Sequence, residues 1–473
     1  MAYEWWMLIP FVLMLGSIAV LPLIPATAHY WEKHSFQLGL ALVLGLPVAF
    51  FVYFVMGYHD AVIHALVEYA QFIALLASLY IVSGAIFLKG DIRATPRNNT
   101  IFLAVGGFIA SFIGTTGAAM LLIRPLLRTN SERTYRVHTV VFTIFIVANC
   151  GGLLTPLGDP PLFLGMLRGV PFSWTFGLWP YWLFVNGLLL AMFYLLDRKL
   201  YAKEPAAALR ADATEVVPLG LRGGFALIWF VAIVAAVAFL PSIDLHAIEE
   251  GHAHAMAWVP LREIVMLGAA AASYFIGDRS IRFQDNQFSW GPILEVAALF
   301  IGIFLTMVPA LKYLRQIAPS LPLDHITFFV FTGGLSAVLD NAPTYVTFFE
   351  MAGTLPGEPR IAGVPEVFLI SISLGAVLCG AITYIGNGPN FMVKAVAEDR
   401  GVTMPSFGGY VVWSFRYLVP IIAAMVLVFI AQSLWATVVG ILLAVAMIPT
   451  AGIGMPRTRP STALSNEAGS RLT

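Results

Sequence analysis

The chain has little charge: Asp, Glu, Lys and Arg make up 11% of its 473 residues, whereas 59% are hydrophobic. Soluble globular domains carry about 25% charged residues, so this composition excludes an ordinary soluble protein. Apolar runs of about 20 residues, the length that crosses a hydrocarbon core, recur along nearly the whole chain. The sequence therefore predicts a polytopic membrane protein made of helices, because a membrane barrel would show alternating strands instead.

Cysteine is scarce too, since the chain has only Cys150 and Cys379, and two cysteines exclude a disulfide framework in a chain of this size. The first apolar run, residues 5–24, has no Lys or Arg before it. A secretory signal peptide needs such a positive region, so we expect this run to stay as a membrane span. The sequence also lacks a nucleophile–base set and an established zinc pattern, which argues against an enzyme.

Two apolar segments are interrupted by glycine and proline, at residues 149–163 and 378–391. They match at a constant offset of 228 residues, and the matched pairs are Gly152 with Gly380, Thr155 with Thr383, Gly158 with Gly386, Pro161 with Pro389, and Phe163 with Phe391. Paired interruptions of this kind in two halves of a chain indicate the binding site of a secondary transporter.

A second repeated feature precedes each interrupted segment. Residues 101–123 are apolar with small and hydroxyl residues at 114–117, and basic residues lie on both sides. Because basic residues collect in the cytoplasm, we expect this stretch to enter the membrane and return as a re-entrant hairpin. Residues 326–350 repeat it, with 340–344 aligned to 113–117 at an offset of 227.

We therefore expect an all-α polytopic membrane protein with about eleven transmembrane helices and two re-entrant hairpins, in two inverted repeats with broken helices. The expected parts are a first half at 1–196 with hairpin 101–123 and broken helix 137–167, a cytoplasmic linker at 197–223, a second half at 224–451 with hairpin 326–350 and broken helix 366–397, and a disordered cytoplasmic tail at 452–473. The distribution of Lys and Arg predicts an inner-membrane protein with its N-terminus outside and its C-terminus in the cytoplasm.

A helix broken inside a bilayer leaves backbone groups that ligand, water or protein must satisfy, so such breaks are costly unless they bind something. The alternative is a simple packing kink. The residues expected to bind ion or substrate are Asn149, Thr155, Gly158, Asp159, Asp340, Asn341, Thr344, Thr383, Gly386, Asn387 and Asn390.

Asp159 and Asp340 are the most specific candidates, because carboxylates at bilayer depth usually mark ion or proton pathways. Together with Asn341 they are the residues expected to bind sodium, as a transported or coupling ion; no other cofactor is expected. The alternative is that either aspartate caps a half-helix.

Other polar groups are weaker candidates. Glu295 could be a buried carboxylate or a solvated one, His138 is expected at the membrane interface, and Lys394 is expected to pair with Glu398 one helical turn later. The loop at 244–254, with His246, His252, His254, Glu249 and Glu250, has a metal-like composition, but its spacing fits no zinc pattern.

The tip followed by the break GGLLTPLGDPP, and then repeated, resembles the ion transporter superfamily, which includes D-type sodium/proton antiporters, arsenite carriers, citrate carriers and divalent-anion/sodium symporters. Asp340-Asn341-Ala342-Pro343 together with Gly158-Asp159 is similar to the antiporter and citrate/arsenite carrier-like branch. The resemblance implies that tips and breaks bind sodium and substrate, and that the protein forms a homodimer. The first tip, Ile113-Gly114-Thr115, departs from the pattern because it lacks the amide and hydroxyl pair.

The sequence thus predicts a secondary active transporter in the lipid bilayer, with no nucleic acid as a partner. Sodium/proton exchange through Asp159 and Asp340 is the first hypothesis. The alternative is a sodium- or proton-coupled symporter of an organic anion such as citrate or a dicarboxylate.

Overall fold

The computed structural model describes residues 3–31, 33–214, 216–243, 248 and 255–453. The chain forms two compact units, and each contains pieces from both halves of the sequence. Unit 1 consists of Met1–Ile86, Pro160–Phe172 and Gly223–Ala376, and unit 2 of Phe87–Asp159, Ser173–Arg222 and Val377–Thr473. The two halves expected at 1–196 and 224–451 describe a repeat in the sequence. The compact units divide the chain in a different way, so they do not test that repeat, and it stays a prediction.

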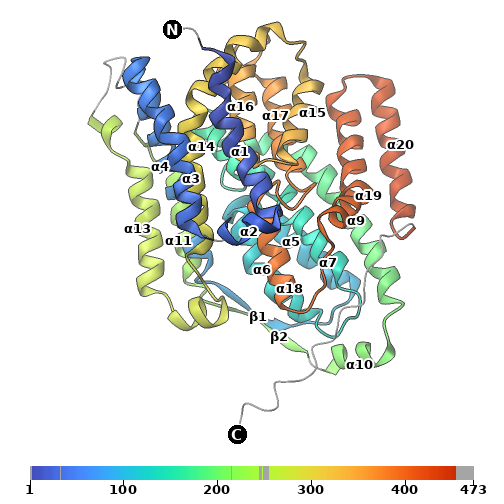
Figure 1. Ribbon diagram of the computed structural model, residues 1–473. Coiled ribbons are helices and arrows are strands. Elements are labelled where there is room, and N and C mark those ends of the chain that lie inside the picture. The colour runs from blue at the N-terminus through green and yellow to red at the C-terminus, as the bar shows by residue number, and fades with distance from the viewer. Residues whose placement is uncertain (1–2, 32, 215, 244–247, 249–254, 454–473) are drawn as a thin grey trace. The chain divides into compact units, whose positions relative to one another are not determined.

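Unit 1 is a helical assembly (Figure 1). Its helices are α1 (Ile9–Val20), α2 (Pro25–Trp31), α3 (His34–Phe50), α4 (His59–Ser83), α8 (Pro160–Leu167), α11 (Ala226–Phe239), α13 (Leu261–Ile276), α14 (Gly291–Ile317), α15 (His325–Ser336), α16 (Asn341–Ala352) and α17 (Glu366–Cys379), the last three residues of which belong to unit 2. Two short strands, β3 (Arg360–Ile361) and β4 (Val364–Pro365), pair in an antiparallel ribbon.

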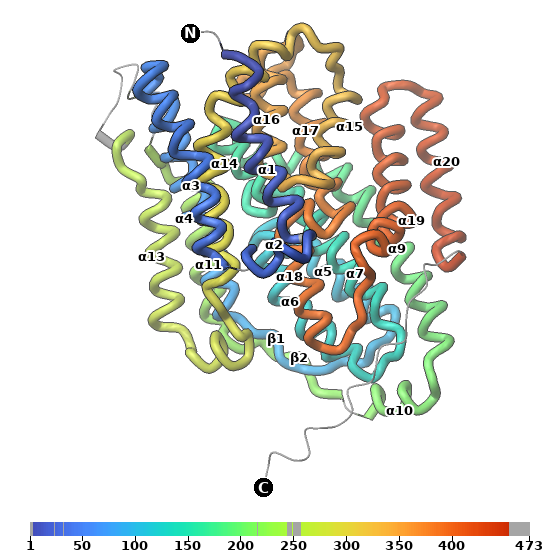
Figure 2. Tube along the Cα trace, in the orientation of Figure 1, coloured from blue at the N-terminus to red at the C-terminus, as the bar shows by residue number. Residues whose placement is uncertain are grey.

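Small residues bring the helices of unit 1 close together. α3 and α14 lie side by side (Figure 2), and a side chain at Gly302 would meet the backbone of Ala41 at 2.8 Å. Lipid tails are as apolar as the helix surfaces, so the hydrophobic effect does not drive two helices together in a bilayer. Close packing at small residues stabilises such a pair instead. Val52, which follows the end of α3, packs in one hydrophobic cluster with Val62 of α4 and Leu305 of α14.

Unit 2 surrounds one buried helix. Its elements are β1 (Phe87–Asp91), α5 (Pro96–Ile113), α6 (Thr115–Thr129), α7 (Val137–Ile146), α9 (Trp179–Tyr201), α10 (Ala206–Thr214), β2 (Val217–Arg222), α18 (Gly388–Asp399), α19 (Phe407–Met425) and α20 (Leu434–Thr450). Every residue of α7 is buried, and α5, α9, α18 and α19 all pack against it. A helix that is apolar on nearly every side is typical of a protein core or of a membrane span.

Six helices among the described residues are long and apolar enough to cross a membrane, and a bent pair at the N-terminus would bring the number to seven. The six are His34–Val55, His59–Ser83, Val137–Leu154, Phe172–Tyr201, Gly291–Ser320 and Phe407–Ile430. Four more apolar helices are shorter, namely α11, α15, α17 and α20. The chain is thus a mainly helical, multi-pass membrane protein, while the expected eleven spans and the inverted repeats stay predictions.

Short strands lie between some of the apolar helices. α4 begins at His59 and ends at Ser83, and β1 begins at Phe87. The linker expected at 197–223 is structured, because it contains α10 and β2. The all-α expectation therefore missed an antiparallel ribbon of β1 and β2, whose glycine and proline are unusual in strands. The tail beyond residue 453 and the loop histidines lie outside the described residues.

Candidate functional site

The first helix break follows from close backbone contact at glycines. After α7 ends at Ile146, a 3-10 turn spans Cys150–Leu154, and α8 begins at Pro160. A Cβ atom on Gly158 would lie 2.1 Å from the carbonyl oxygen of Gly152, so only glycine fits there. Proline is favoured at the first turn of a helix, where its missing N–H costs nothing, so Pro160 starts α8 at this point.

The tip between α5 and α6 contacts this break directly. Gly114 alone separates the two helices, with φ of 84°, a value that favours glycine. The backbone N–H of Thr115 donates to the carbonyl of Gly158 at 2.8 Å, and its hydroxyl donates to Asp159 Oδ1 at 2.9 Å. Asp159 is 1% exposed, so its carboxylate is held inside unit 2 at the N-terminal end of α6.

The second break reaches the same carboxylate through Asn387. The side-chain amide of Asn387 lies 3.2 Å from Asp159 Oδ1 and 3.0 Å from Asn149 Oδ1. Asn149 in turn donates to Asn390 Oδ1 at 2.7 Å, and Asn390 donates to the carbonyls of Gly380 and Thr383 at 2.9 Å each. Three buried asparagines thus connect the two breaks inside unit 2.

The two matched threonines make the same local bond. Thr155 Oγ1 accepts the N–H of Leu157 at 3.1 Å, and Thr383 Oγ1 accepts the N–H of Ile385 at 3.2 Å. The Thr155 hydroxyl also donates to the carbonyl of Ser111 on α5. These hydroxyls therefore shape the turns of the breaks, as threonine commonly does in turns. Gly386 is buried next to Asn387 in the second break.

The second tip places three candidates in unit 1. Asp340 caps α16, with its Oδ1 accepting the N–H of Ala342 at 3.0 Å, and the Thr344 hydroxyl donates to the carbonyl of Asp340 at 2.9 Å. Asn341 is the first residue of α16 and is fully buried. Asp340 therefore caps a helix, as the alternative to ion binding had predicted. Asp340 and Asn341 belong to unit 1 whereas Asp159 belongs to unit 2.

Thr115 is a site residue that was not among the expected ones. The first tip was expected to lack the amide and hydroxyl pair of the family pattern, yet its Thr115 hydroxyl donates a hydrogen bond to Asp159. The threonine pair in Gly114-Thr115-Thr116 was the available signal. No group of three or more His, Cys, Asp or Glu side chains that could hold a metal occurs among the residues whose placement is described. The donors around Asp159 are instead neutral hydroxyl and amide groups.

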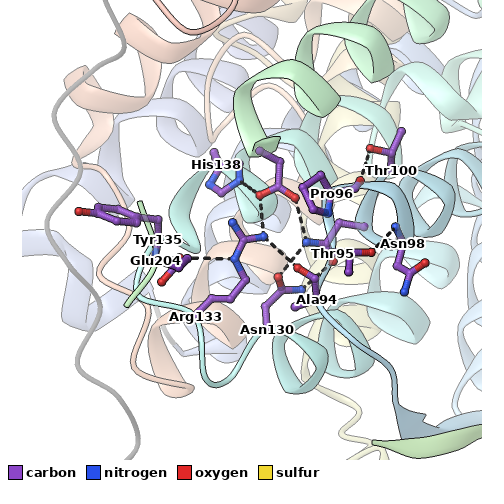
Figure 3. Close-up of polar contacts among 12 residues, drawn as sticks. Ala94, Thr95, Pro96, Asn98, Thr100, Asn130, Arg133, Tyr135, His138 and Glu204 are labelled. Carbon is purple, nitrogen blue, oxygen red and sulfur yellow. Dashed lines mark hydrogen bonds and ion pairs between the residues drawn. The ribbon is translucent and has the colours of Figure 1, made fainter. Parts of the chain in front are cut away.

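A second buried polar network lies elsewhere in unit 2 (Figure 3). Arg133 Nη1 lies 2.6 Å from Asp197 Oδ1, and His138 Nε2 lies 2.8 Å from the same oxygen. Arg133 also contacts Glu204 at 3.4 Å, and Asn99 donates to Asp197 Oδ2 at 3.1 Å. His138 is 0% exposed, so the expectation of an interfacial histidine was wrong: the ring packs against α9 and needs the Asp197 carboxylate as a partner.

The remaining candidates make polar contacts of their own. Glu295 on α14 accepts a hydrogen bond from Gln37 at 3.1 Å, in unit 1. Lys394 pairs with Glu398 at 2.8 Å, which confirms the expected pair one turn apart on α18.

Comparison with known proteins identifies the family. Residues 1–430 match the model of a family described as "Putative citrate transport". An uncharacterized transporter of Mycobacterium bovis and one of Mycobacterium tuberculosis are each 24% identical over 370 residues, which cover 74% of this chain and 80% of each relative. A 46 kDa membrane protein of Mycobacterium leprae is 21% identical over 331 residues, or 67% of this chain and 73% of the relative.

The matched description concerns citrate and not sodium/proton exchange, so the comparisons support a transporter family and do not support the antiporter branch. The match covers both helix breaks, both tips and most of the apolar helices. The chain belongs to this family of membrane transporters, the one described as "Putative citrate transport".

Proposed function

We propose that the protein is a cation-coupled symporter of an organic anion such as citrate or a dicarboxylate. The observation that carries the proposal is the position of Asp159, a buried carboxylate to which both helix breaks and the first tip contribute contacts. The family description supports the organic anion as the cargo.

The cation would bind at Asp159. Burying a carboxylate at bilayer depth costs about 2.5–3.5 kcal/mol or more. The hydrogen bonds from Thr115 and Asn387 each contribute about 1.5–3 kcal/mol to a charged group, so together they offset a cost of that size. The carboxylate can therefore be held ready for sodium or a proton, with amide and carbonyl oxygens of the breaks as further ligands for sodium.

The anion would bind near the N-terminal ends of α6 and α18. α6 begins at Thr115 and α18 begins at Gly388 directly after Asn387, so both helix ends belong to the contacts around Asp159. A helix N-terminus carries a partial positive charge and free N–H groups, which suit a substrate carboxylate. A bound cation at Asp159 would neutralise the carboxylate that otherwise repels the substrate, and this repulsion couples the two bindings.

The experiment is uptake of labelled citrate and succinate into vesicles that contain the purified protein, driven by a sodium gradient or by a proton gradient. The proposal expects uptake that depends on one of the two gradients. Two outcomes would contradict it: no uptake of either citrate or succinate with either gradient, and uptake that is equally fast when both gradients are absent. Vesicles without protein are the control for leakage.

Sodium/proton exchange is the second candidate function. It is favoured by the single carboxylate Asp159 among neutral donors, a group that could hold either cation in turn. The same vesicles with a pH-sensitive dye discriminate the two: sodium-driven proton flux without any organic anion supports exchange, and flux that requires the anion supports the symporter.

Placement in the inner membrane, with the N-terminus outside and the C-terminus in the cytoplasm, is part of the proposal and is supported by the distribution of Lys and Arg in the sequence. A homodimer is proposed from the resemblance alone; crosslinking of the purified protein tests it.

A further inference from the structure

The ribbon of β1 and β2 is an antiparallel element of unit 2 (Figure 1). The strands are antiparallel, with Leu88 opposite Leu221 and Lys89 opposite Gly220. Successive side chains of a strand point to opposite faces, so this register fixes which side chains share a face. Leu88 and Leu221 lie on one face, and Lys89 lies on the other. Beyond the irregularity between Lys89 and Asp91, Asp91 lies opposite Val217, at the edge of the first face.

The side chains that β2 contributes to the first face are apolar and exposed. Val217, Leu219 and Leu221 alternate along β2 and are 46%, 46% and 49% exposed. A strand of a folded protein normally turns its apolar face to the core and its polar face outward. Here β2 leaves the apolar side chains of one face exposed, so this face is available to an apolar partner.

Basic residues accompany the ribbon. Lys89 on the opposite face is exposed, and Arg93 and Arg97, which follow β1, are exposed as well. An element with one apolar face and a basic border is the pattern of segments that lie in the interface of an anionic membrane. Each lysine or arginine near such a surface is attracted to the negative headgroups.

The ribbon is held rigidly at its place in unit 2. Arg128 of α6 donates to the carbonyls of Gly90 at 3.1 Å and Leu88 at 2.9 Å, and its guanidinium lies 5.2 Å from the ring of Phe87. The presentation of the apolar face is therefore a property of the folded unit and not of a loose loop.

Short connections join the ribbon to apolar helices along the chain. Only residues 84–86 connect β1 to α4, which is a candidate membrane span, and only 223–225 connect β2 to the apolar helix α11. Three residues reach about 10 Å at most. β1 thus begins a few residues after one apolar helix ends, and β2 ends a few residues before another begins.

We propose that the β1–β2 ribbon lies in the bilayer interface, with Val217, Leu219 and Leu221 inserted between lipids and with Lys89, Arg93 and Arg97 bound to the headgroups of anionic phospholipids. The bilayer is favoured over a second protein copy because the exposed side chains combine an apolar face with basic neighbours, which matches lipid and its phosphate.

The test places a nitroxide label at neighbouring positions of β2, in Leu219→Cys and in Pro218→Cys. The two positions lie on opposite faces of one strand, so Pro218→Cys is the matched control. The native Cys150 and Cys379 are buried, and unlabelled background is read from the wild-type chain. Each variant is reconstituted in vesicles of phosphatidylcholine with phosphatidylglycerol, after its elution and helix content have been matched to the wild type.

The expected result is several-fold lower accessibility to a water-soluble relaxation agent, and higher accessibility to oxygen, at position 219 than at position 218. Equal accessibility to the water-soluble agent at both positions would overturn the proposal. Dipolar broadening between two labels at position 219 would also overturn it, because it would place a second copy on this face.

The charge component has its own measurement. Removing phosphatidylglycerol should raise the aqueous accessibility of position 219, and the combined change Lys89→Gln and Arg93→Gln should abolish that dependence. An accessibility that does not respond to phosphatidylglycerol in the otherwise unchanged chain would overturn the anionic-lipid part.

Discussion

Asn149 and Asn387, one from each helix break, share a hydrogen bond of 3.0 Å between Oδ1 of Asn149 and Nδ2 of Asn387. They lie 238 residues apart in the chain, and both are buried. Burial makes an unpaired amide costly, so each asparagine depends on the other to hold the two breaks together. The ion site at Asp159 rests on this pair, because Asn387 is also a donor to Asp159.

The pair predicts energetic coupling. Asn149→Ala and Asn387→Ala should each destabilise the protein, and the double variant should be less destabilised than the sum of the two by about 0.5–3 kcal/mol. Thermal unfolding of the purified protein in one detergent measures all four corners of the cycle. Strictly additive effects would mean that the hydrogen bond contributes nothing.

We predict that position 158 tolerates no residue other than glycine. In Gly158→Ala the new Cβ would lie 2.1 Å from the carbonyl oxygen of Gly152, a backbone atom that cannot move aside without opening the break. Overpacking typically costs about 1–3 kcal/mol, and more where backbone must shift. Gly388→Ala is the matched control, because a Cβ atom at Gly388 would meet nothing within 4 Å. Wild-type folding and transport in Gly158→Ala would contradict the geometry.

The two repeated breaks show what could be predicted. Gly158, Pro160 and Gly388 interrupt apolar runs, and glycine and proline determine local backbone structure almost independently of distant residues. The positions of both breaks and of Gly114 between α5 and α6 were therefore readable from the sequence. The membrane class followed in the same way from apolar run length.

Contacts between distant residues could not be predicted. Thr115 and Asp159 are 44 residues apart, and Arg133 and Asp197 are 64 residues apart. No local sequence pattern indicates that either pair is in contact. His138 follows a basic segment, which made an interfacial position the natural expectation. The fold of unit 2 shows that α9 packs over His138 and that Asp197 of α9 is its hydrogen-bond partner.

The Arg133–Asp197 ion pair predicts a large loss on removal of one charge. Both side chains are at most 1% exposed, so Arg133→Gln leaves the Asp197 carboxylate buried without its cationic partner. Breaking a buried pair in this way costs about 3–5 kcal/mol. Lys394→Gln, which breaks the more exposed pair with Glu398, should cost about 1 kcal/mol or less. Similar shifts of the unfolding temperature in both variants would contradict the assignment.

Asp324 predicts a pH-dependent helix cap. The N–H of Thr327 donates to Asp324 Oδ1 at 2.7 Å, and this bond holds the pKa of the Asp324 carboxyl below its usual value. A lowered pKa means that the stabilisation is present above the unfolded value of about 3.9 and is lost as the pH falls through the folded pKa.

Asp324→Ala should therefore lose about 0.5–1 kcal/mol at neutral pH, at the low end because the group is solvent-exposed, and the difference from wild type should shrink at about pH 3. Asp324→Asn keeps the cap without the charge, so its difference from Asp324→Ala should not change with pH. Thermal unfolding at the two pH values checks this. A wild-type advantage over Asp324→Ala that is the same at both pH values would refute the charged cap.

The central claim is that Asp159 binds the coupling cation of an organic-anion symporter, and gradient-driven citrate uptake by Asp159→Asn tests it most directly. Asparagine keeps the size and the acceptor for Thr115 and Asn387 but removes the charge. The predicted result is a loss of gradient-stimulated uptake of at least about tenfold, equivalent to about 1.4 kcal/mol, in a protein that still folds. Wild-type uptake with wild-type gradient dependence in Asp159→Asn would contradict the account.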